Sequence, residues 1–523
     1  MVYAIEPYRN LTRKSFFQGA SFLHLLAPEG LICPRPFASR HWAGNLGKSA
    51  NQTLAVSIDS EPTQAQQRKN FPRKVSVREG VISLTNSMSS PLSGSISNDT
   101  VPSIDPSLVP PHILGNGAIF KLGVEGGNLA GGFEFFSLQI RKRPDEAALK
   151  LDLALLHLLL GRSKEAYQVQ AQALETQHLF RVVGTLGQET KKRRRLLAFM
   201  APGDFTNNAQ LEFILDGADV ALDVLYVVPG KPLPSAVPDH DVAFCAVNES
   251  EENNPILERL SRLLPQWPRP VINIPEKIAQ LSRDKVSSLF HDDPPIYAPP
   301  VVRVEYGDLN RVGLGQVSLN SLLGGGIDFP VLVRPVGSHG GKDLEKMESP
   351  ENLATYLARF ESPTGPFFVS PFVDYRGADG LYRKYRIAVF EGNPFLCHMA
   401  LSEHWMIHYV NVGMAEDAAK RAEEADAMET FDHDFAVRHQ AAFASLYEQL
   451  GLDYFILDCG ELLDGRLLLF ETDIAMVIHA IDSQSVFPYK RGQMAKVFNA
   501  FCEMVDRASQ WSPGLRQGHS QTL

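Results

Sequence analysis

The sequence predicts an α/β domain followed by an α+β portion, with further segments ahead of both. Between residues 195 and 300, short apolar runs such as LLAFMA (196–201) alternate with helical patterns, which is typical of a parallel sheet. After residue 329, apolar runs are joined by tight turns such as Asp464-Gly465, which favours antiparallel pairing. At 523 residues the chain is longer than one ordinary hydrophobic core supports, so we expect about two to four domains.

The composition is that of a soluble globular protein, with 44% hydrophobic and 21% charged residues. A formal net charge of -10 argues against a general nucleic-acid binder, which usually carries a basic surface. The five cysteines lack CxxC spacing, so they predict neither a zinc site nor a disulfide framework, and a reducing cytoplasm is the simplest location. No apolar run reaches the ~18 residues of a membrane span. We therefore expect no membrane contact.

The first 112 residues lack the pattern of a packed core. Residues 83–111 are rich in Ser and Pro, and residues 1–60 contain only three acids, which loosely resembles a transit peptide. We expect residues 1–112 to be disordered or dispensable, and non-native sequence read from an upstream start would look the same. Residues 511–523 are expected to form a C-terminal tail.

A helical segment is predicted over residues 113–190. Residues 144–178 contain two apolar-periodic runs broken at Leu160-Gly161-Arg162, which predicts a helix, a tight turn and a second helix. The pattern resembles a tetratricopeptide repeat, although a plain helical hairpin packed on its neighbour fits equally well, and a preceding pair over 117–141 stays open. The basic run KKRRR (191–195) is interpreted as a solvated linker into the strand 196–201 rather than as a nucleic-acid or targeting signal.

The apolar runs give the predicted elements in order. In the α/β portion, strands are expected at 196–201, 221–228, 242–247 and 271–274, with helices at 211–217, 254–264 and 275–290. In the α+β portion, helices are expected at 349–360 and 434–451, with strands at 329–336, 365–373, 383–392, 395–403, 453–463 and 466–474.

Three acids on the last predicted hairpin carry the strongest chemical signal. Glu471 and Asp473 are two residues apart on one strand and therefore share a face. If the strands pair about Asp464-Gly465, Asp458 lies across the ladder from them. Three carboxylates in an apolar hairpin repel one another unless a cation lies between them, and their oxygens suit Mg²⁺. The alternative is a row of solvent-facing acids.

A glycine-rich loop lies upstream, in the stretch LVRPVGSHGGKDLEKM (332–347). Its glycines would let backbone N–H groups approach an anion such as a nucleotide phosphate. Taken alone, the loop is better explained as an ordinary glycine-rich hairpin. Four other stretches accompany it: Arg283-Asp284-Lys285, VSPFVDY (369–375), the same-face pair Lys384 and Arg386, and SEHWMIHYVN (402–411).

Together and in this order, these parts resemble the ATP-grasp superfamily over roughly residues 195–508. The arrangement is most similar to the glutathione-synthetase and ribosomal-protein glutamate-ligase branch, and to proteins with a tetratricopeptide segment ahead of an ATP-grasp module. The resemblance implies an ATP-grasp fold, with a pre-ATP-grasp α/β domain at 195–300 and an ATP-grasp domain of two α+β lobes at 301–510.

The resemblance also implies roles for the matching residues. ATP would be bound by the early Lys285, the strand residue Arg334, the covering loop and the adenine hinge, the last two comprising Ser338, His339, Gly340, Gly341, Ser370, Phe372, Val373 and Asp374. Arg386 and Lys342 would act in catalysis. Mg²⁺ would be held by Asp458, Glu471 and Asp473. The substrate would be contacted by His404, His408 and Asn411, the two histidines having a packed aromatic cluster as their alternative.

Two positions depart from the family pattern. Arg334 stands where the family usually has Lys, but it stays cationic and can bind phosphate through two N–H groups. Asp473 stands where the third metal ligand is usually Asn, and its extra negative charge would tighten Mg²⁺ binding.

The implied reaction is ATP- and Mg²⁺-dependent joining of a carboxylate to an amine or thiol through an acylphosphate, on an amino-acid or peptide-like substrate. Two alternatives stay open at this point. One is an ATP-grasp phosphotransferase acting on an alcohol or phosphate. The other is a catalytically degenerate scaffold that binds a protein partner through the helical segment. A homodimer is likewise left open.

Overall fold

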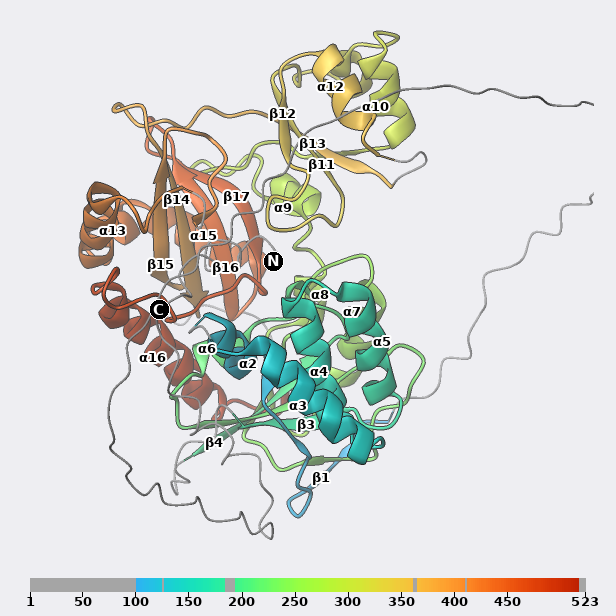
Figure 1. Cartoon of the computed structure of the whole chain (residues 1–523). Coiled ribbons are helices and arrows are strands. Elements are labelled where there is room, and N and C mark those ends of the chain that lie inside the picture. Colours follow the sequence, from blue (N-terminus) through green and yellow to red (C-terminus); the bar gives the residue numbers. More distant parts are fainter. Residues whose placement is uncertain (1–99, 125–126, 184–192, 361–364, 410–411, 517–523) are drawn as a thin grey trace, which may run out of the picture. The chain divides into compact units, whose positions relative to one another are not determined.

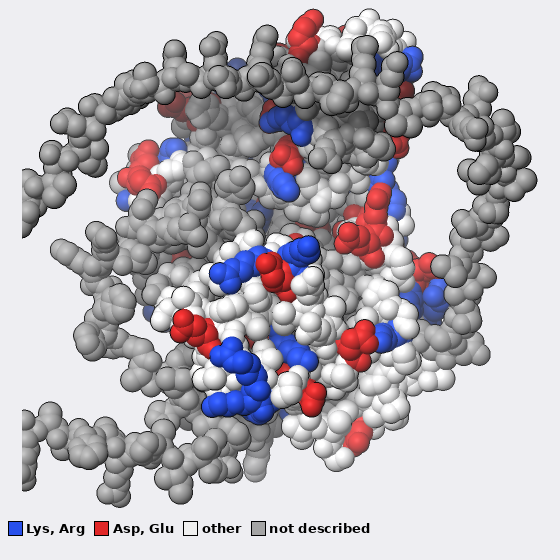
Figure 2. Space-filling view, turned by 45° about the vertical axis from the view of Figure 1, so that its right-hand side comes forward, with Lys and Arg blue, Asp and Glu red and all other residues white. Residues whose placement is uncertain are grey.

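The computed structural model describes residues 100–516, except 125–126, 184–192, 361–364 and 410–411. The expectations for residues 1–99 and 517–523 therefore lie outside the described residues. Within the described ranges, no helix is both long enough and apolar enough to cross a bilayer. On the face shown in Figure 2, basic and acidic side chains lie interspersed rather than gathered into a field of one sign.

A seven-stranded sheet forms the α/β part, in the order β18-β8-β7-β4-β5-β3-β2. Its centre is parallel and was predicted: β4 (Arg194–Met200), β5 (Val220–Tyr226), β7 (Val242–Cys245) and β8 (Pro270–Ile272). Their near-continuous apolar sequences are almost fully buried, as expected of a sheet covered on both faces. The associated helices are α6 (Leu211–Ile214), α7 (Asn254–Leu263), α8 (Pro275–Ile278) and α9 (Arg283–Leu289).

The sheet also takes strands from outside residues 195–300. β3 (Leu179–Val182) pairs antiparallel with β5, β2 (His112–Ile113) pairs with β3, and β18 (Gly514–Leu515) pairs with β8. A separate two-stranded sheet joins β1 (Ser103–Asp105) to β6 (Ala236–Pro238). Residues 103–105 and His112, which were expected to be disordered or dispensable, are thus in strands of the folded chain, as are Ile113 of the predicted helical segment and part of the expected C-terminal tail.

Four helices lie between β2 and β3: α2 (Gly115–Val124), α3 (Leu129–Lys142), α4 (Ala147–Leu159) and α5 (Ser163–Leu174). The predicted turn between α4 and α5 is present, with Gly161 at φ +74°, and the pair left open over 117–141 is also helical. The segment is bound into the α/β part, since the buried Asp152 carboxylate of α4 accepts hydrogen bonds from the backbone N–H groups of Leu114 (3.0 Å) and Gly115 (3.2 Å). Its tetratricopeptide character stays a prediction.

A four-stranded antiparallel sheet follows, in the order β10 (Val302–Val304), β13 (Phe367–Pro371), β11 (Val331–Pro335) and β12 (Glu345–Met347). The helices α10 (Tyr306–Gly313) and α12 (Pro350–Leu357) pack on each other beside it, and α11 (Leu319–Leu322) lies between α10 and β11 in sequence. This part has its own hydrophobic core, formed by residues such as Leu309, Val331, Leu353 and Phe367.

A five-stranded sheet carries the predicted hairpin, in the order β15 (Asn393–Ser402), β14 (Tyr382–Phe390), β16 (Tyr454–Glu461), β17 (Leu467–Asp473) and β9 (Ile296–Tyr297). The helices α13 (Ala418–Thr430) and α16 (Lys490–Ala508) contact each other and pack on β15 (Figure 1). The sheet shares one large hydrophobic core with the α/β part.

Two predicted helices are each divided in the structure. The helix expected at 275–290 is α8 and α9, because Ser282, at the N-cap position of α9, adopts an extended conformation that interrupts the helix. The helix expected at 434–451 is α14 (Phe435–Arg438) and α15 (Gln440–Leu450), separated at His439. Hydrophobic periodicity continues through both breaks, so it does not reveal them.

Asp152 makes a testable prediction about stability. Burial raises the pKa of this carboxyl to about 7, whereas an unfolded Asp titrates near ~4. The native chain thus holds a proton that the unfolded chain lacks, so the free energy of unfolding should fall as the pH rises from about 4 to about 7. The neutral Asp152→Asn variant should lack that contribution, which amounts to up to about 4 kcal/mol. Urea unfolding of both proteins at pH 5 and pH 8 measures the difference, and parallel pH profiles would contradict the prediction.

Candidate functional site

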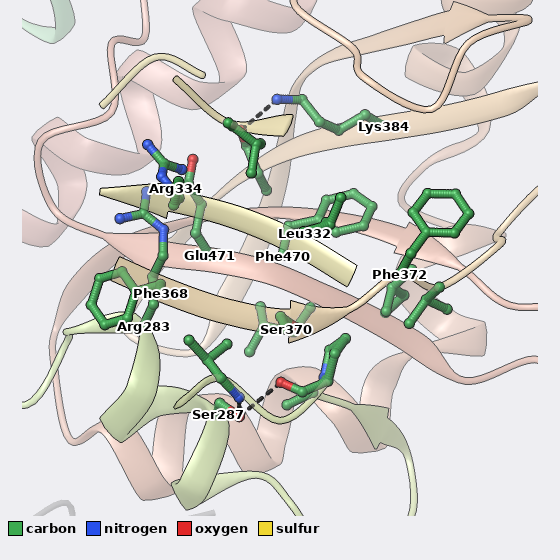
Figure 3. Close-up of a pocket in the computed structure, with 18 of the residues that line it drawn as sticks. Arg283, Ser287, Leu332, Arg334, Phe368, Ser370, Phe372, Lys384, Phe470 and Glu471 are labelled. Carbon is green, nitrogen blue, oxygen red and sulfur yellow. Dashed lines mark hydrogen bonds and ion pairs between the residues drawn. The ribbon is translucent and has the colours of Figure 1, made fainter. Parts of the chain in front are cut away.

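A cavity of about 200 Å³ lies between the four-stranded and five-stranded sheets, with α9 along its side. One end is apolar and aromatic, and the other end is charged. Figure 3 shows the arrangement, with Arg283, Arg334 and Glu471 grouped at one end and Phe372 at the other, and with Leu332 and Phe470 between them.

The apolar end is built by the residues that follow β13 and by the centre of β17. Ser370, Phe372 and Val373, the residues assigned to the adenine hinge, line it, and their role in binding a nucleotide stays a prediction. Phe372 packs edge-on against Trp405, with ring centroids 5.8 Å apart, and the Lys346 ammonium lies 4.1 Å from the Phe372 ring. The cavity here is therefore an apolar, aromatic-lined slot that suits a flat heterocycle.

The charged end is built around the acids of the β16–β17 hairpin. Asp458 and Glu471 are direct partners across the ladder, and Arg386 of β14 is opposite Asp458 on its other side. Lys384 Nζ lies 2.8 Å from Asp458, and Arg386 Nε lies 2.8 Å from it. Burial raises the pKa of Asp458, but Arg386 and Lys384 outweigh it and hold the pKa well below its ordinary value. Asp458 is therefore ionised and neutralised by two cations.

Glu471 has a different cationic partner. Arg283, the first residue of α9, forms an ion pair with it. Burial raises the pKa of Glu471, and Arg283 more than compensates, so the carboxyl is ionised. Arg334 completes the group at this end of the cavity. Burial, with Arg283 nearby, lowers the pKa of Arg334 to about 10, so its guanidinium stays charged at neutral pH.

Asp473 lies on the same face of β17 but has no cationic partner in the described part of the chain. Its carboxylate accepts hydrogen bonds from the backbone N–H groups of Ala475 (2.9 Å) and Met476 (2.8 Å) and so caps the turn that follows the strand. Burial, with a further contribution from Glu471, raises the pKa of Asp473 to about 7.

The donor set has the chemistry that Mg²⁺ prefers, but its arrangement is not a three-ligand group. Among the described residues, no three His, Cys, Asp or Glu side chains lie close enough together to hold a metal. Asp458 and Glu471 face each other across the ladder, and each forms ion pairs with cationic side chains. The prediction that Asp458, Glu471 and Asp473 bind a metal together stays a prediction.

The glycine-rich loop is the turn of the β11–β12 hairpin. Arg334 holds it in place, because its guanidinium donates hydrogen bonds to the hydroxyl (2.9 Å) and the carbonyl of Ser338. Gly341, at φ +73°, lies so close to His408 that a Cβ there would sit 2.0 Å from the imidazole Nε2. Only glycine fits this contact, which joins the loop to the segment after β15.

Members of the loop differ in what they face. Gly341 lines the cavity, and His339 lines a second cavity beside it. Ser338 and Gly340 line neither, since the Ser338 hydroxyl donates to the carbonyl of Pro335 (2.8 Å). Lys342 is exposed and also lines neither cavity. Lys342, to which the family resemblance gives a catalytic role, is therefore not at the cavity wall in this conformation.

The early basic residue at the cavity is Arg283 rather than Lys285. Lys285 is exposed, and its ammonium donates to the carbonyl of Ala279 (2.7 Å). The reason is helical geometry, because two residues along an α-helix point to different faces. The break at Ser282 makes Arg283 the first residue of α9 and turns it towards Glu471.

Of four other residues that were predicted to be functional, one lines the cavity and three do not. Arg386 pairs with Asp458 and donates to the carbonyl of Val477 (3.2 Å), so Lys384 reaches the cavity instead. Asp374 forms a surface ion pair with Arg376 and does not line the cavity. His404 is exposed and away from it, whereas His408 lines it, with a pKa lowered by burial. Asn411 lies outside the described residues.

Several lining residues were not assigned from the sequence. Ser287, Tyr375, Trp405, Phe470 and Thr472 all border the cavity. Phe470 and Thr472 flank Glu471, so their position on β17 was a usable signal. For Trp405, next to His404, the sequence indicated only aromatic packing with the histidines.

No protein-family model matches the sequence, and no curated protein matches it either. Solved structures that resemble it were found. A D-alanine–D-alanine ligase from Bacillus anthracis complexed with ATP is 12% identical, with a TM-score of 0.33, over 60% of this chain and 96% of the ligase. A RimK domain ATP-grasp protein from Sphaerobacter thermophilus is 13% identical, with a TM-score of 0.34, over 59% and 99%. D-alanyl-alanine synthetase A from Vibrio cholerae is 12% identical, with a TM-score of 0.39, over 61% and 99%.

One of these three proteins is named as an ATP-grasp protein. Because all three TM-scores are below 0.5, the matches say nothing about activity, substrate or site residues. The function is therefore inferred from the side chains of the cavities.

The ion pairs of Asp458 predict a large effect of its removal. The Asp458→Asn variant leaves the largely buried Lys384 and Arg386 side chains without a carboxylate, which should destabilise the fold by about 3 kcal/mol. Urea denaturation of the variant and of the wild type measures this loss in the free energy of unfolding. Asp464→Asn is the matched control, since Asp464 lies in the turn of the same hairpin and forms an exposed pair with Arg466, which should contribute less than about 1 kcal/mol. Equal stability of the two variants would contradict this account.

Proposed function

We propose that the chain is an ATP- and Mg²⁺-dependent ligase that joins a carboxylate to an amine through an acylphosphate. One observation carries the proposal: the cavity has an apolar, aromatic slot at one end and Arg283, Arg334 and Lys384 at the other. This division matches a nucleoside triphosphate, which has a flat base at one end and a chain of phosphates at the other.

The base would occupy the slot beside Ser370, Phe372 and Val373. Aromatic side chains there supply a large apolar contact, and the β13 backbone continues directly into it. Ser287 and Thr472, also in the lining, add hydroxyl groups that can accept or donate hydrogen bonds to the nucleotide.

The phosphates would lie against Arg283, Arg334 and Lys384, under the loop that carries Gly341. Arginine suits this role because its fork of N–H groups can bind two phosphate oxygens together. Lys342 stays a candidate for a rearranged loop, since Gly341 next to it lines the cavity, whereas Lys285 is exposed and does not line the cavity.

Asp458, Glu471 and Asp473 would hold Mg²⁺, which supplies charge neutralisation for the phosphates. Arg283 and Lys384 now neutralise Glu471 and Asp458. When those carboxylates have another cation, the two basic side chains become available to phosphate oxygens. The ion pairs thus balance the charges of these side chains.

The reaction would begin with attack of a substrate carboxylate oxygen on the γ-phosphorus, with cleavage of the bond to the β-phosphate oxygen and release of ADP. An amine would then attack the acyl carbon and release inorganic phosphate. The protein contributes positioning and charge stabilisation rather than covalent chemistry. Lys384, which lines the cavity where the sequence predicted Arg386, is proposed to steady the transferred phosphoryl group, and His408 to contact the substrate.

Nucleotide binding by paired variants tests the site. Arg283→Met should weaken the binding of a non-hydrolysable ATP analogue with Mg²⁺ by at least about tenfold, because it removes a cation that faces the cavity. Lys285→Met changes the charge equally, two residues further along the same helix, and should bind like the wild type. Isothermal titration calorimetry gives both constants. A loss confined to Lys285→Met would instead restore the assignment made from the sequence.

A further inference from the structure

A second cavity, of about 450 Å³, adjoins the first and shares Arg283, Glu471 and Thr472 with it. We call it the acidic cavity, and its carboxylates are Asp204, Glu249, Glu251, Glu252, Glu471 and Asp473. The two cavities meet at the charged end of the first one. A group bound in the acidic cavity would therefore lie beside the place proposed for the phosphates.

Negative charge in the acidic cavity exceeds positive charge. Its lining has six carboxylates against two guanidinium groups, those of Arg283 and Arg303. Arg283 pairs with Glu471, and Arg303 pairs with Glu251. In the described part of the chain, this leaves Asp204, Glu249, Glu252 and Asp473 without an ion-pair partner.

Glu249, like Asp204 and Asp473, is partly buried, whereas Glu252 is exposed. Burial raises the pKa of Glu249, although Lys285 nearby acts in the opposite direction. A carboxylate in this position gains the most from a positively charged ligand, because the ligand supplies the missing counter-ion in a place with restricted access to water.

A buried hydroxyl also points to a polar ligand. Ser282, which is only 7% exposed, lines the acidic cavity, and no described residue forms a hydrogen bond with its Oγ. Buried polar atoms without a partner are uncommon in folded proteins. This one lies at the start of α9, next to Arg283, where the two cavities meet.

Helix α5 of the helical segment forms part of the wall. The Tyr167 hydroxyl donates to the Asp204 carboxylate (3.2 Å). Gln170 binds both backbone groups of Gly203, donating to its carbonyl (2.9 Å) and accepting from its N–H (2.8 Å). The helical segment thus fixes the turn that carries Asp204 into the cavity.

We propose that the acidic cavity binds the amine substrate as a cation, with Glu249 as its counter-ion and α5 as part of its wall. The chemical class is an amine that carries a second positive charge, such as a diamine or a basic amino-acid side chain. This inference rests on the proposed ligase function, and it gives the helical segment a role in choosing the substrate.

The experiment titrates the full chain, saturated with a non-hydrolysable ATP analogue and Mg²⁺, with the diamine cadaverine and separately with the dianion glutarate. Cadaverine should bind and glutarate should not. Glu249→Gln should weaken cadaverine binding by at least tenfold without changing the affinity for the ATP analogue. Glu258→Gln is the matched control, because Glu258 is exposed on α7, pairs with Arg262 and does not line the acidic cavity.

A second variant guards against misfolding of the first. Glu252 is exposed at the rim, and Glu252→Lys should also weaken cadaverine binding. Failure of cadaverine to bind, binding of glutarate with equal affinity, or unchanged binding in both cavity variants would overturn the inference. Failure of the wild type to bind the ATP analogue would instead contradict the proposed function. If cadaverine still bound in that case, and bound through Glu249, the inference that the acidic cavity takes a cationic amine would still hold.

Discussion

The buried charge cluster on β14, β16 and β17 is the constraint on which the site depends. Asp458 is almost fully buried, and the sheet register places Arg386 on one side of it and Glu471 on the other. A carboxylate can be buried there only because Lys384 and Arg386 both reach it. The same pattern is repeated at the next acid, where Arg283 compensates Glu471. The strand ladder therefore fixes the positions of acids and cations together.

This cluster explains why two cavities of different character meet at one point. On one side, Arg283, Arg334 and Lys384 present positive charge next to an apolar slot. On the other side, unpaired carboxylates such as Glu249 present negative charge. A polyanion and a cation would each find a complementary wall, and their reacting ends would meet near Glu471. A ligase requires its nucleotide and its amine to meet in this way, because proximity and orientation lower the barrier to attack of the amine on the acylphosphate.

Much of this arrangement could be predicted from the sequence, because it follows from the pattern of apolar residues and from the residues that form the turns. Continuous apolar runs and the turn at Asp464-Gly465 set the β16–β17 pairing, and with it the approach of Asp458 to Glu471. The choice of Arg283 over Lys285 could not be predicted, since it depends on where α9 begins. The ion pairs of Asp458 were equally hidden, because they depend on side chains of a strand 72 to 74 residues away. The acidic cavity was missed because its carboxylates come from three separate parts of the chain: the turn at Asp204, the segment 249–252 after β7, and strand β17.

The most direct test of the central claim is calorimetric titration of the full chain with a non-hydrolysable ATP analogue, in the presence and absence of Mg²⁺. The charge cluster predicts saturable binding that Mg²⁺ strengthens, since the ion would replace Arg283 and Lys384 at the carboxylates and release them to the phosphates. Absence of binding by the folded protein would contradict the account. Binding that Mg²⁺ leaves unchanged would contradict the role given to Asp458, Glu471 and Asp473.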